Sequence, residues 1–172
     1  MHLARQSSAG DPGGVAECPA ETLLFDQPID HPATNSSQTF KQRYQIDTSN
    51  FKEGGPILFY QSPEATDIAC IVRTLPFGGP FRTLTGLQSV LLFTEWAKEL
   101  GGITATLEHR YFGQSLPFGN DSYTLDNLKH FTLENVMQDA VNFLDFIKQN
   151  VTGAADSKVI VAGGMSATSP SS

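Results

Sequence analysis

The chain has 172 residues, of which 40% are hydrophobic and 17% charged, and this composition predicts one packed domain or part of one. A formal net charge of -7 with only eleven Lys and Arg argues against nucleic acid or an anionic membrane as a partner, because phosphate groups are bound by clustered basic residues. No apolar run approaches the roughly 20 residues that cross a bilayer, so no transmembrane span is expected.

The chain begins with a polar stretch that precedes the first predicted strands. Residues 1–20 are rich in Ser, Gly, Pro and Ala without a period, which is typical of a mobile leader, and they lack the apolar core of a signal peptide. Two runs with the alternation of strands follow, LLFDQPIDH at 23–31 and TFKQRYQID at 39–47. The polar segment between them predicts an antiparallel pair.

The next elements alternate between strand and helix. Four apolar residues at Ile57–Tyr60 predict a strand buried on both faces. A helix over Leu91–Leu100 is predicted from apolar residues that recur every fourth position. Those residues are Leu92, Trp96 and Leu100. ITATLEHR at 103–110 then predicts another strand.

The strongest helical pattern covers 133–151, with Thr132 as its N-cap. Its apolar positions fall on one helical face. They are Val136, Ala140, Phe143, Leu144, Ile147 and Val151. KVIVAGG at 158–164 closes the series as a central strand. A hairpin followed by alternating strands and helices predicts an α/β fold with parallel strands and crossover helices.

One segment does not fit the domain predicted over 21–164. The sequence from Cys70 to Ser89 has neither period, and such a long connection inside a compact domain is uncommon. We interpret 71–92 as a doubtful insertion and 165–172 as an aberrant tail. The hypothesis is that both represent translated intron or frameshifted sequence.

The most specific stretch is LEHRYFGQSLPFG at 107–119. It resembles the EHRYYG-x-S-x-P block of the serine peptidase family that contains lysosomal Pro-Xaa carboxypeptidase, dipeptidyl peptidase II and thymus-specific serine protease. FDQPIDH, TFKQRYQI, GGPILFYQSPEA and FTLENVMQDAVNFLDFIK resemble further blocks of that family in the same order. The resemblance implies an α/β-hydrolase core and a Ser, Asp, His triad that removes residues next to proline at one end of a peptide.

The family's nucleophile turn reads GGSYGG, and this sequence departs from it after Gly163-Gly164. An ungapped alignment places Met165, which has no proton to give, at the nucleophile position. A shift of one residue places Ser166 there but puts Thr168 where the second glycine belongs. Ser166 is therefore the candidate nucleophile, and membership of a Ser/Thr/Pro tail is the favoured alternative.

The other triad residues are not found in the expected place. In α/β-hydrolases the Asp or Glu and the His follow the nucleophile in the chain, whereas all four histidines here precede Ser166. We expect the N-terminal part of a serine exopeptidase that ends at the nucleophile turn and is inactive as written. Two alternatives stay open: another α/β-hydrolase such as an esterase, and a non-catalytic binding or regulatory fragment that pairs its open sheet edge with a full-length relative.

Three further features are candidates for the site. Glu108, His109 and Arg110 suggest an acid/base group, but an ion-paired shell that fixes the neighbouring loop is the favoured interpretation. Glu64 follows a strand where hydrolases of this fold take an oxyanion-hole amide, and the resemblance places it near the peptide substrate. The pair at 30–31 is expected to be structural, because adjacent strand residues point to opposite faces.

The sequence also contains possible modification sites. Asn35, Asn120 and Asn150 begin N-glycosylation sequons, and the family implies a secreted or lysosomal/vacuolar protein. Cys18 and Cys70 are compatible with one disulfide, with free thiols or with partners elsewhere. No His, Cys, Asp or Glu cluster has metal-site spacing, so neither a metal nor a cofactor is expected.

Overall fold

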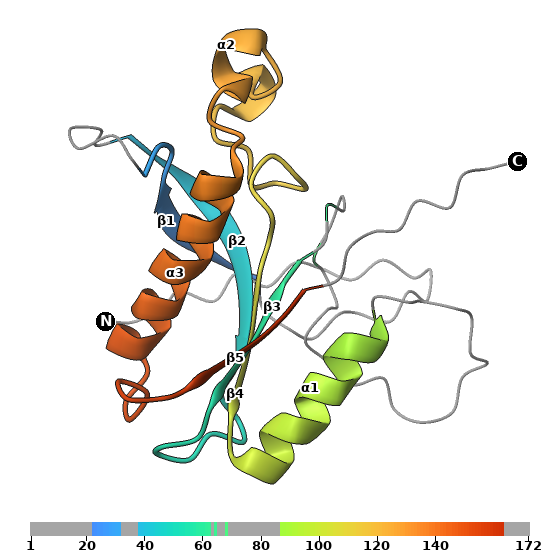
Figure 1. The fold of residues 1–172 in the computed structure, drawn as a ribbon, viewed down its shortest axis with the longest axis vertical. Coiled ribbons are helices and arrows are strands. Elements are labelled where there is room, and N and C mark those ends of the chain that lie inside the picture. The colour runs from blue at the N-terminus through green and yellow to red at the C-terminus, as the bar shows by residue number, and fades with distance from the viewer. Residues whose placement is uncertain (1–21, 32–37, 63, 65–67, 69–86, 164–172) are drawn as a thin grey trace, which may run out of the picture.

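A computed structural model of the chain describes residues 22–31, 38–62, 64, 68 and 87–163. Within these ranges the chain forms a five-stranded sheet with helices packed against it (Figure 1). In chain order the elements are β1 (Leu23–Pro28), β2 (Thr39–Asp47), β3 (Ile57–Gln61), α1 (Leu87–Leu100), β4 (Ile103–Leu107), η1 (Gly119–Asp121), α2 (Leu125–Leu128), α3 (Leu133–Asn150) and β5 (Val159–Gly163).

The sheet combines antiparallel and parallel pairing. Its strand order is β1-β2-β4-β3-β5. β2 pairs antiparallel with both β1 and β4, whereas β3 pairs in parallel with β4 and β5. Parallel neighbours require a crossover, which α1 supplies between β3 and β4 and α3 supplies between β4 and β5. The predicted hairpin, the parallel strands and the α/β class are therefore confirmed.

The larger hydrophobic core lies on the side of the sheet that α3 covers. Alternate residues of β3 and β4 point to this side, because side chains alternate along a strand. The Phe143 ring of α3 lies with its centroid 5.0 Å from that of Tyr44 and 6.0 Å from that of Phe59. The buried members of this core are Tyr44, Ile57, Phe59, Ile103, Ala105, Leu107, Phe143, Ile147 and Ala154.

Helix α3 begins where the sequence predicts. The Thr132 side chain accepts a hydrogen bond from the backbone N–H of Asn135 and so caps the helix. Of the predicted apolar face, Phe143 and Ile147 are fully buried. The other members of that face are only partly buried, while the polar residues Asn135 and Asp139 are buried beside it.

Helix α1 packs on the opposite side of the sheet. Phe93 and Ala97 are buried there in one cluster with Leu58 and Tyr60 of β3. The predicted apolar face of this helix is wrong for Trp96 and Leu100, which are 38% and 51% exposed. Phe93 and Ala97 have the same four-residue spacing, one position further along the helix, so spacing alone does not determine which face is buried. In the fold, the sheet covers the face that carries Phe93 and Ala97. The helix also begins at Leu87, before the predicted start and inside the doubtful segment.

The connection from β4 to α3 differs most from the prediction. The predicted strand over 103–110 ends at Leu107, so Glu108 and the two residues after it form the start of a loop. Two short helices, η1 and α2, follow in a stretch where no element was expected. This connection carries the residues that are central to the site below.

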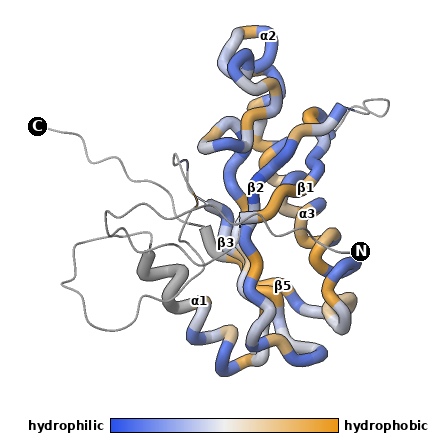
Figure 2. The backbone as a smooth tube through the Cα atoms, turned by 180° about the vertical axis from the view of Figure 1, so that it is seen from behind, coloured by the Kyte–Doolittle hydropathy of each residue, from blue (hydrophilic) through white to orange (hydrophobic). Residues whose placement is uncertain are grey.

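Apolar side chains remain exposed at two places. Leu133, Met137 and Val141 lie at four-residue spacing on α3, and Ile160 and Val161 lie on β5. Figure 2 shows that both α3 and β5 include stretches of hydrophobic sequence. Within the described ranges β5 pairs only with β3, so its other edge has no strand beside it. No helix in the described part of the chain has the length and hydropathy needed to span a bilayer.

Candidate active site at the carboxyl edge of the sheet

Three parallel strands end level with one another. The pairing registers place Gln61 of β3 beside Leu107 of β4 on one side and Gly163 of β5 on the other. Open α/β sheets bind ligands outside the carboxyl ends of their parallel strands. This edge, from which Glu64 and the loop after Leu107 continue, is therefore the candidate site.

The loop after β4 has a strained backbone. Tyr111 has a φ of 70°, in the left-handed region that side-chain-bearing residues seldom adopt, although it is only 1% exposed. Its N–H donates to the Ser115 carbonyl, its carbonyl accepts from the Tyr123 hydroxyl, and its own hydroxyl donates to the Asn127 carbonyl. Burial raises the pKa of this hydroxyl, and the charge of Arg110 opposes the rise. Such strain persists where surrounding contacts determine the conformation, often at functional sites.

Glu108 holds the same loop from inside. Its fully buried carboxylate accepts from the Ser115 hydroxyl at 2.6 Å and from the backbone N–H of Gln114 at 3.1 Å. The Arg43 guanidinium lies 3.4 Å from the other carboxylate oxygen. Gly113 adopts a φ of 56°, and a Cβ there would lie 2.1 Å from the carboxylate. Glycine is thus required for the loop to wrap around Glu108.

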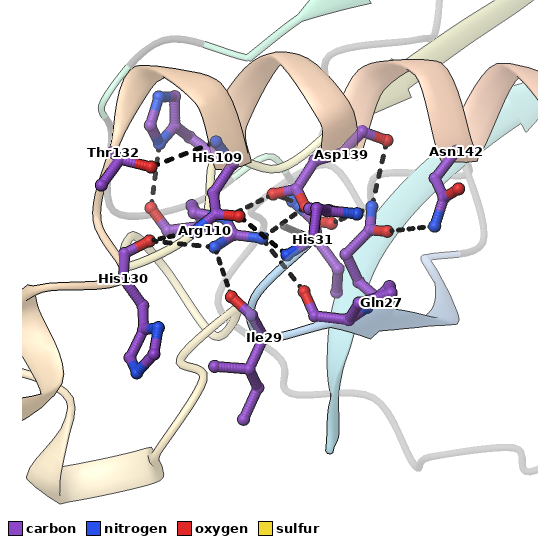
Figure 3. A network of polar contacts seen from close by, with 12 residues as sticks. Gln27, Ile29, His31, His109, Arg110, His130, Thr132, Asp139 and Asn142 are labelled. Atoms are coloured by element: carbon purple, nitrogen blue, oxygen red, sulfur yellow. Dashed lines mark hydrogen bonds and ion pairs between the residues drawn. The ribbon is translucent and has the colours of Figure 1, made fainter. Parts of the chain in front are cut away.

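Arg110 is fully buried on the α3 side of the edge (Figure 3). Its Nε donates to Asp139 Oδ2 at 2.7 Å and its Nη2 to Asp139 Oδ1 at 2.5 Å. The remaining N–H groups donate to backbone carbonyls, namely those of Pro28, Ile29 and His130. All five donors of a guanidinium therefore have acceptors. Arg110 therefore forms a structural ion pair with Asp139 and has no N–H group left to bind a substrate.

Asp139 extends this pair into a network. It also accepts from His31 Nε2 at 2.8 Å and from Gln42 Nε2 at 3.3 Å. Gln27 donates to both the Gln42 side chain and the Asp139 carbonyl. The network joins β1, β2, the loop after β4 and α3, so it fixes where α3 begins relative to the candidate site.

His109 lies between these two buried charges but points elsewhere. Its Nδ1 lies 2.9 Å from the Arg110 carbonyl, which only accepts hydrogen bonds, so Nδ1 carries a proton and donates it to this contact. The ring makes edge contacts with Phe112 at 5.3 Å and Phe131 at 5.7 Å between centroids. It lines a cavity of about 210 Å³ together with Glu64 and the residues Phe131, Thr132, Leu133 and Val136 around the start of α3.

Comparison with known proteins identifies the family. The family model described as Serine carboxypeptidase S28 matches residues 27–169, which is most of the chain. The chain belongs to the serine carboxypeptidase S28 family. Among curated relatives, the lysosomal Pro-X carboxypeptidase of Bos taurus is 34% identical over 142 residues, and that of Homo sapiens is 33% identical over 144. These alignments cover 81% and 83% of the chain. Serine protease vicPa of Bipolaris victoriae is 37% identical over 122 residues, which cover 69% of the chain.

The chain spans about a quarter of the length of these S28 relatives, since the alignments cover 25%, 26% and 20% of the bovine, human and fungal proteins. The α/β sheet described above agrees with the α/β-hydrolase core that the family resemblance implies. In such a core the nucleophile turn follows a strand, and β5 ends at Gly163, directly before the Gly164-Met165-Ser166 sequence.

Several predicted residues lie outside the described part of the chain. They are Ser166, Met165, Asn35, Cys18 and Cys70. Asp30 and His31 do not form a pair with each other: His31 contacts Asp139, and Asp30 lies 3.6 Å from His130 Nδ1. Among the residues that the structure describes, no group of three His, Cys, Asp or Glu side chains is arranged to hold a metal ion.

The sequence analysis missed Asp139 as the central acid of the edge. A signal existed, because Asp139 precedes Phe143 and Ile147 at four-residue spacing and therefore shares their buried helical face. A buried carboxylate requires a partner, and the fully buried Arg110 is that partner. It also missed Phe131 and Leu133 as lining residues, for which spacing gave no signal.

Proposed function

We propose that this chain carries the N-terminal part of a serine exopeptidase that cleaves peptides next to proline. The observation that carries the proposal is the S28 match over 27–169, which includes both the loop after β4 and the end of β5. The relatives named lysosomal Pro-X carboxypeptidase support cleavage next to proline, and the relative named serine protease supports peptide hydrolysis in general. The peptide would lie along the carboxyl edge of the sheet.

The chemistry we propose is attack by a serine at the turn after β5. Ser166 is the candidate, and the Asp and His of the triad would follow it in the order that this fold uses. All four histidines of this sequence precede Ser166, so the proposal assigns none of them as the triad base. Glu64 would belong to the loop that donates one oxyanion-hole N–H, because that loop follows β3.

We also propose passage through the secretory route to a lysosomal or vacuolar compartment, as the name of the relatives suggests. Two sequon asparagines, Asn120 and Asn150, are exposed, as an acceptor for N-glycosylation must be. Expression in a secreting eukaryotic host, followed by peptide mapping after glycosidase treatment, tests this. Unmodified asparagines in secreted protein would contradict it.

A chimera tests the peptidase proposal. Residues 22–163 of this chain would replace the matching segment of human lysosomal Pro-X carboxypeptidase, which would retain its own sequence from the nucleophile turn onward. We expect secreted, monodisperse chimera to hydrolyse a Pro-X peptide and to lose this activity when its nucleophile serine is replaced by alanine. A folded chimera that cleaves acyl esters but no proline peptide would instead support the esterase alternative.

A binding fragment is the second candidate function. It is favoured by the unpaired edge of β5 and by the exposed apolar residues Ile160 and Val161 beside it, because such an edge readily pairs with another strand. Co-expression of the chain with a full-length S28 relative tests this candidate. Co-purification at fixed stoichiometry would support it. A monodisperse, cooperatively melting monomer that does not bind the relative would contradict it.

A further inference from the structure

The two sequons in the described part of the chain lie in different structural settings. Asn120 belongs to η1, inside the connection from β4 to α3, whereas Asn150 is the last residue of α3. Both asparagine side chains are exposed. Because the sequon pattern requires a hydroxyl two residues after the asparagine, the enzyme that transfers the glycan must reach that hydroxyl as well as the amide. The hydroxyls in question belong to Ser122 and Thr152.

The hydroxyl of the first sequon is inaccessible in the folded chain. Ser122 is fully buried, and its Oγ accepts a hydrogen bond from the Phe118 N–H at 2.9 Å. The Ser122 N–H donates to the Gly119 carbonyl at 3.2 Å, which closes the turn around Asn120. An enzyme that binds this hydroxyl must therefore break the hydrogen bond to Phe118 and expose a buried side chain.

Neighbouring residues hold the same turn in place. The carbonyl of Asp121, the middle residue of the sequon, accepts at 3.0 Å from both the Thr124 hydroxyl and the Asn127 side-chain amide. The Tyr123 hydroxyl donates at 2.6 Å to the carbonyl of Tyr111. Because these hydrogen bonds link the turn to the strained loop after β4, the sequon opens only when several of them break together.

The second sequon lies at the end of a helix. Thr152 is exposed, and Val151 has left the helical conformation, with a φ of -98° and a ψ of 116°. The Asn150 side-chain amide donates to the Phe146 carbonyl at 2.8 Å, but this hydrogen bond is exposed to solvent. Helix ends fray at little cost, so both groups of this sequon become available while the sheet stays folded.

We propose that Asn120 accepts a glycan only before the connection from β4 to α3 folds, whereas Asn150 remains an acceptor in the folded chain. The proposal rests on the secretory route proposed above and goes beyond it by giving the order of each modification relative to folding. A glycan attached early is compatible with the fold, because the Asn120 side chain is exposed. Occupancy of Asn120 therefore records the competition between glycan transfer and closure of the turn.

Glycan transfer to purified protein tests this order. The unmodified full chain would be incubated with an oligosaccharyltransferase and a lipid-linked oligosaccharide, and synthetic peptides of residues 115–127 and 145–157 would serve as unfolded references. Relative to its own peptide, we expect transfer to be slowed at least about 30-fold at Asn120 and less than about 3-fold at Asn150. Transfer to Asn120 at the rate of its peptide, or equal slowing at both sites, would overturn the proposal.

Two glycine variants locate the barrier. Gly113→Ala would place a Cβ against the Glu108 carboxylate and so weaken the loop after β4. We expect this variant to raise transfer to Asn120 at least about 5-fold and to leave Asn150 unchanged. Gly153→Ala is the matched control, because Gly153 also has a positive φ, of 85°, but lies beyond α3 with no contact to its Cβ position closer than 3.4 Å. An equal rise at Asn120 in both variants would assign the barrier to global unfolding and overturn the role of the loop.

Hydrogen exchange of the Phe118 amide shows in the same samples whether the turn is closed. We expect slow exchange in the parent chain, because this N–H donates to the buried Ser122 hydroxyl. Fast exchange there would contradict the closed turn on which the proposal depends. None of these measurements requires secretion or peptide hydrolysis, so their failure is distinguishable from failure of the secretory route, which expression in a secreting host tests, and of the peptidase function, which the chimera tests.

Discussion

Glu108 and Arg110 flank His109 and are both fully buried, yet the fold compensates their charges in different ways. Arg110 finds an acceptor for every N–H, including two oxygens of Asp139. Glu108 uses one carboxylate oxygen for two hydrogen bonds, while the other oxygen lies 3.4 Å from Arg43 without hydrogen-bond geometry. The charge of Arg110 is therefore compensated by more hydrogen bonds than the charge of Glu108.

The partners also differ in their distance along the chain. Arg110 joins the end of β1, the carbonyl of His130 and α3, so its contacts assemble distant segments. The Glu108 carboxylate contacts Gln114 and Ser115 within its own loop, and Arg43 of β2 lies near its second oxygen. Arg110 therefore determines how the edge is assembled, whereas Glu108 determines the shape of one loop.

The largest effect is expected from Asp139→Ala. This substitution leaves the Arg110 guanidinium buried without its carboxylate, and breaking a buried pair in this way costs about 3–5 kcal/mol. Urea denaturation monitored by circular dichroism measures the loss. Asp145→Ala, at an exposed position of the same helix, is the control and is expected to change little. Similar losses in the two variants would contradict a special contribution of the buried pair between Asp139 and Arg110.

A smaller effect, about 3 kcal/mol, is expected from Gly113→Ala. The new Cβ would meet the Glu108 carboxylate at 2.1 Å, in addition to the strain of a positive φ. Gly119→Ala is the matched control, because Gly119 has the same φ of 56° and nothing within 4 Å of its Cβ position. We expect about 1 kcal/mol there. Equal costs would show that backbone strain alone, and not Glu108, requires glycine in the loop.

Replacement of the glutamate itself is expected to cost less than loss of Asp139. Glu108→Gln keeps the shape and an acceptor for Ser115 but removes the charge near Arg43, which we expect to cost about 1–2 kcal/mol. Glu95→Gln, which disrupts the exposed pair with Lys98, should cost under about 0.5 kcal/mol. If Glu108→Gln cost as much as Asp139→Ala, the two charges would be equivalent after all.

The smallest effect is expected at high pH. Burial raises the pKa of the Tyr60 hydroxyl above its ordinary value of 10.0, so the folded state keeps a proton that the unfolded state loses. This contribution to stability is therefore fully present below pH 10 and declines as the pH rises through the folded pKa. Urea midpoints of the parent chain and of Tyr60→Phe at pH 7 and above pH 10 measure it. A steeper decline in the variant would contradict the shift.

The sequence predicted the elements well where burial follows a regular pattern along the chain. The hairpin and the helix capped by Thr132 follow from the periods of half-buried segments, and the strand at Ile57–Tyr60 follows from an apolar run that is buried on both faces. The same reasoning failed for α1, because adjacent helical faces were both apolar and only the sheet selects between them. It also failed to end β4 at Leu107, since the Glu-His-Arg sequence carries no turn signal.

The sequence by itself determined the family and the order of its elements, because the blocks around EHRYFG and QRY are long enough to be specific. Only the tertiary structure determined which side-chain contacts those blocks make. Asp139 lies 29 residues from Arg110, and no local pattern records that their side chains meet. Glu64 lies far along the chain from His109, although both line one cavity. Burial of a charge is a property of the folded environment, and its partner is whichever group the sheet and α3 bring within reach.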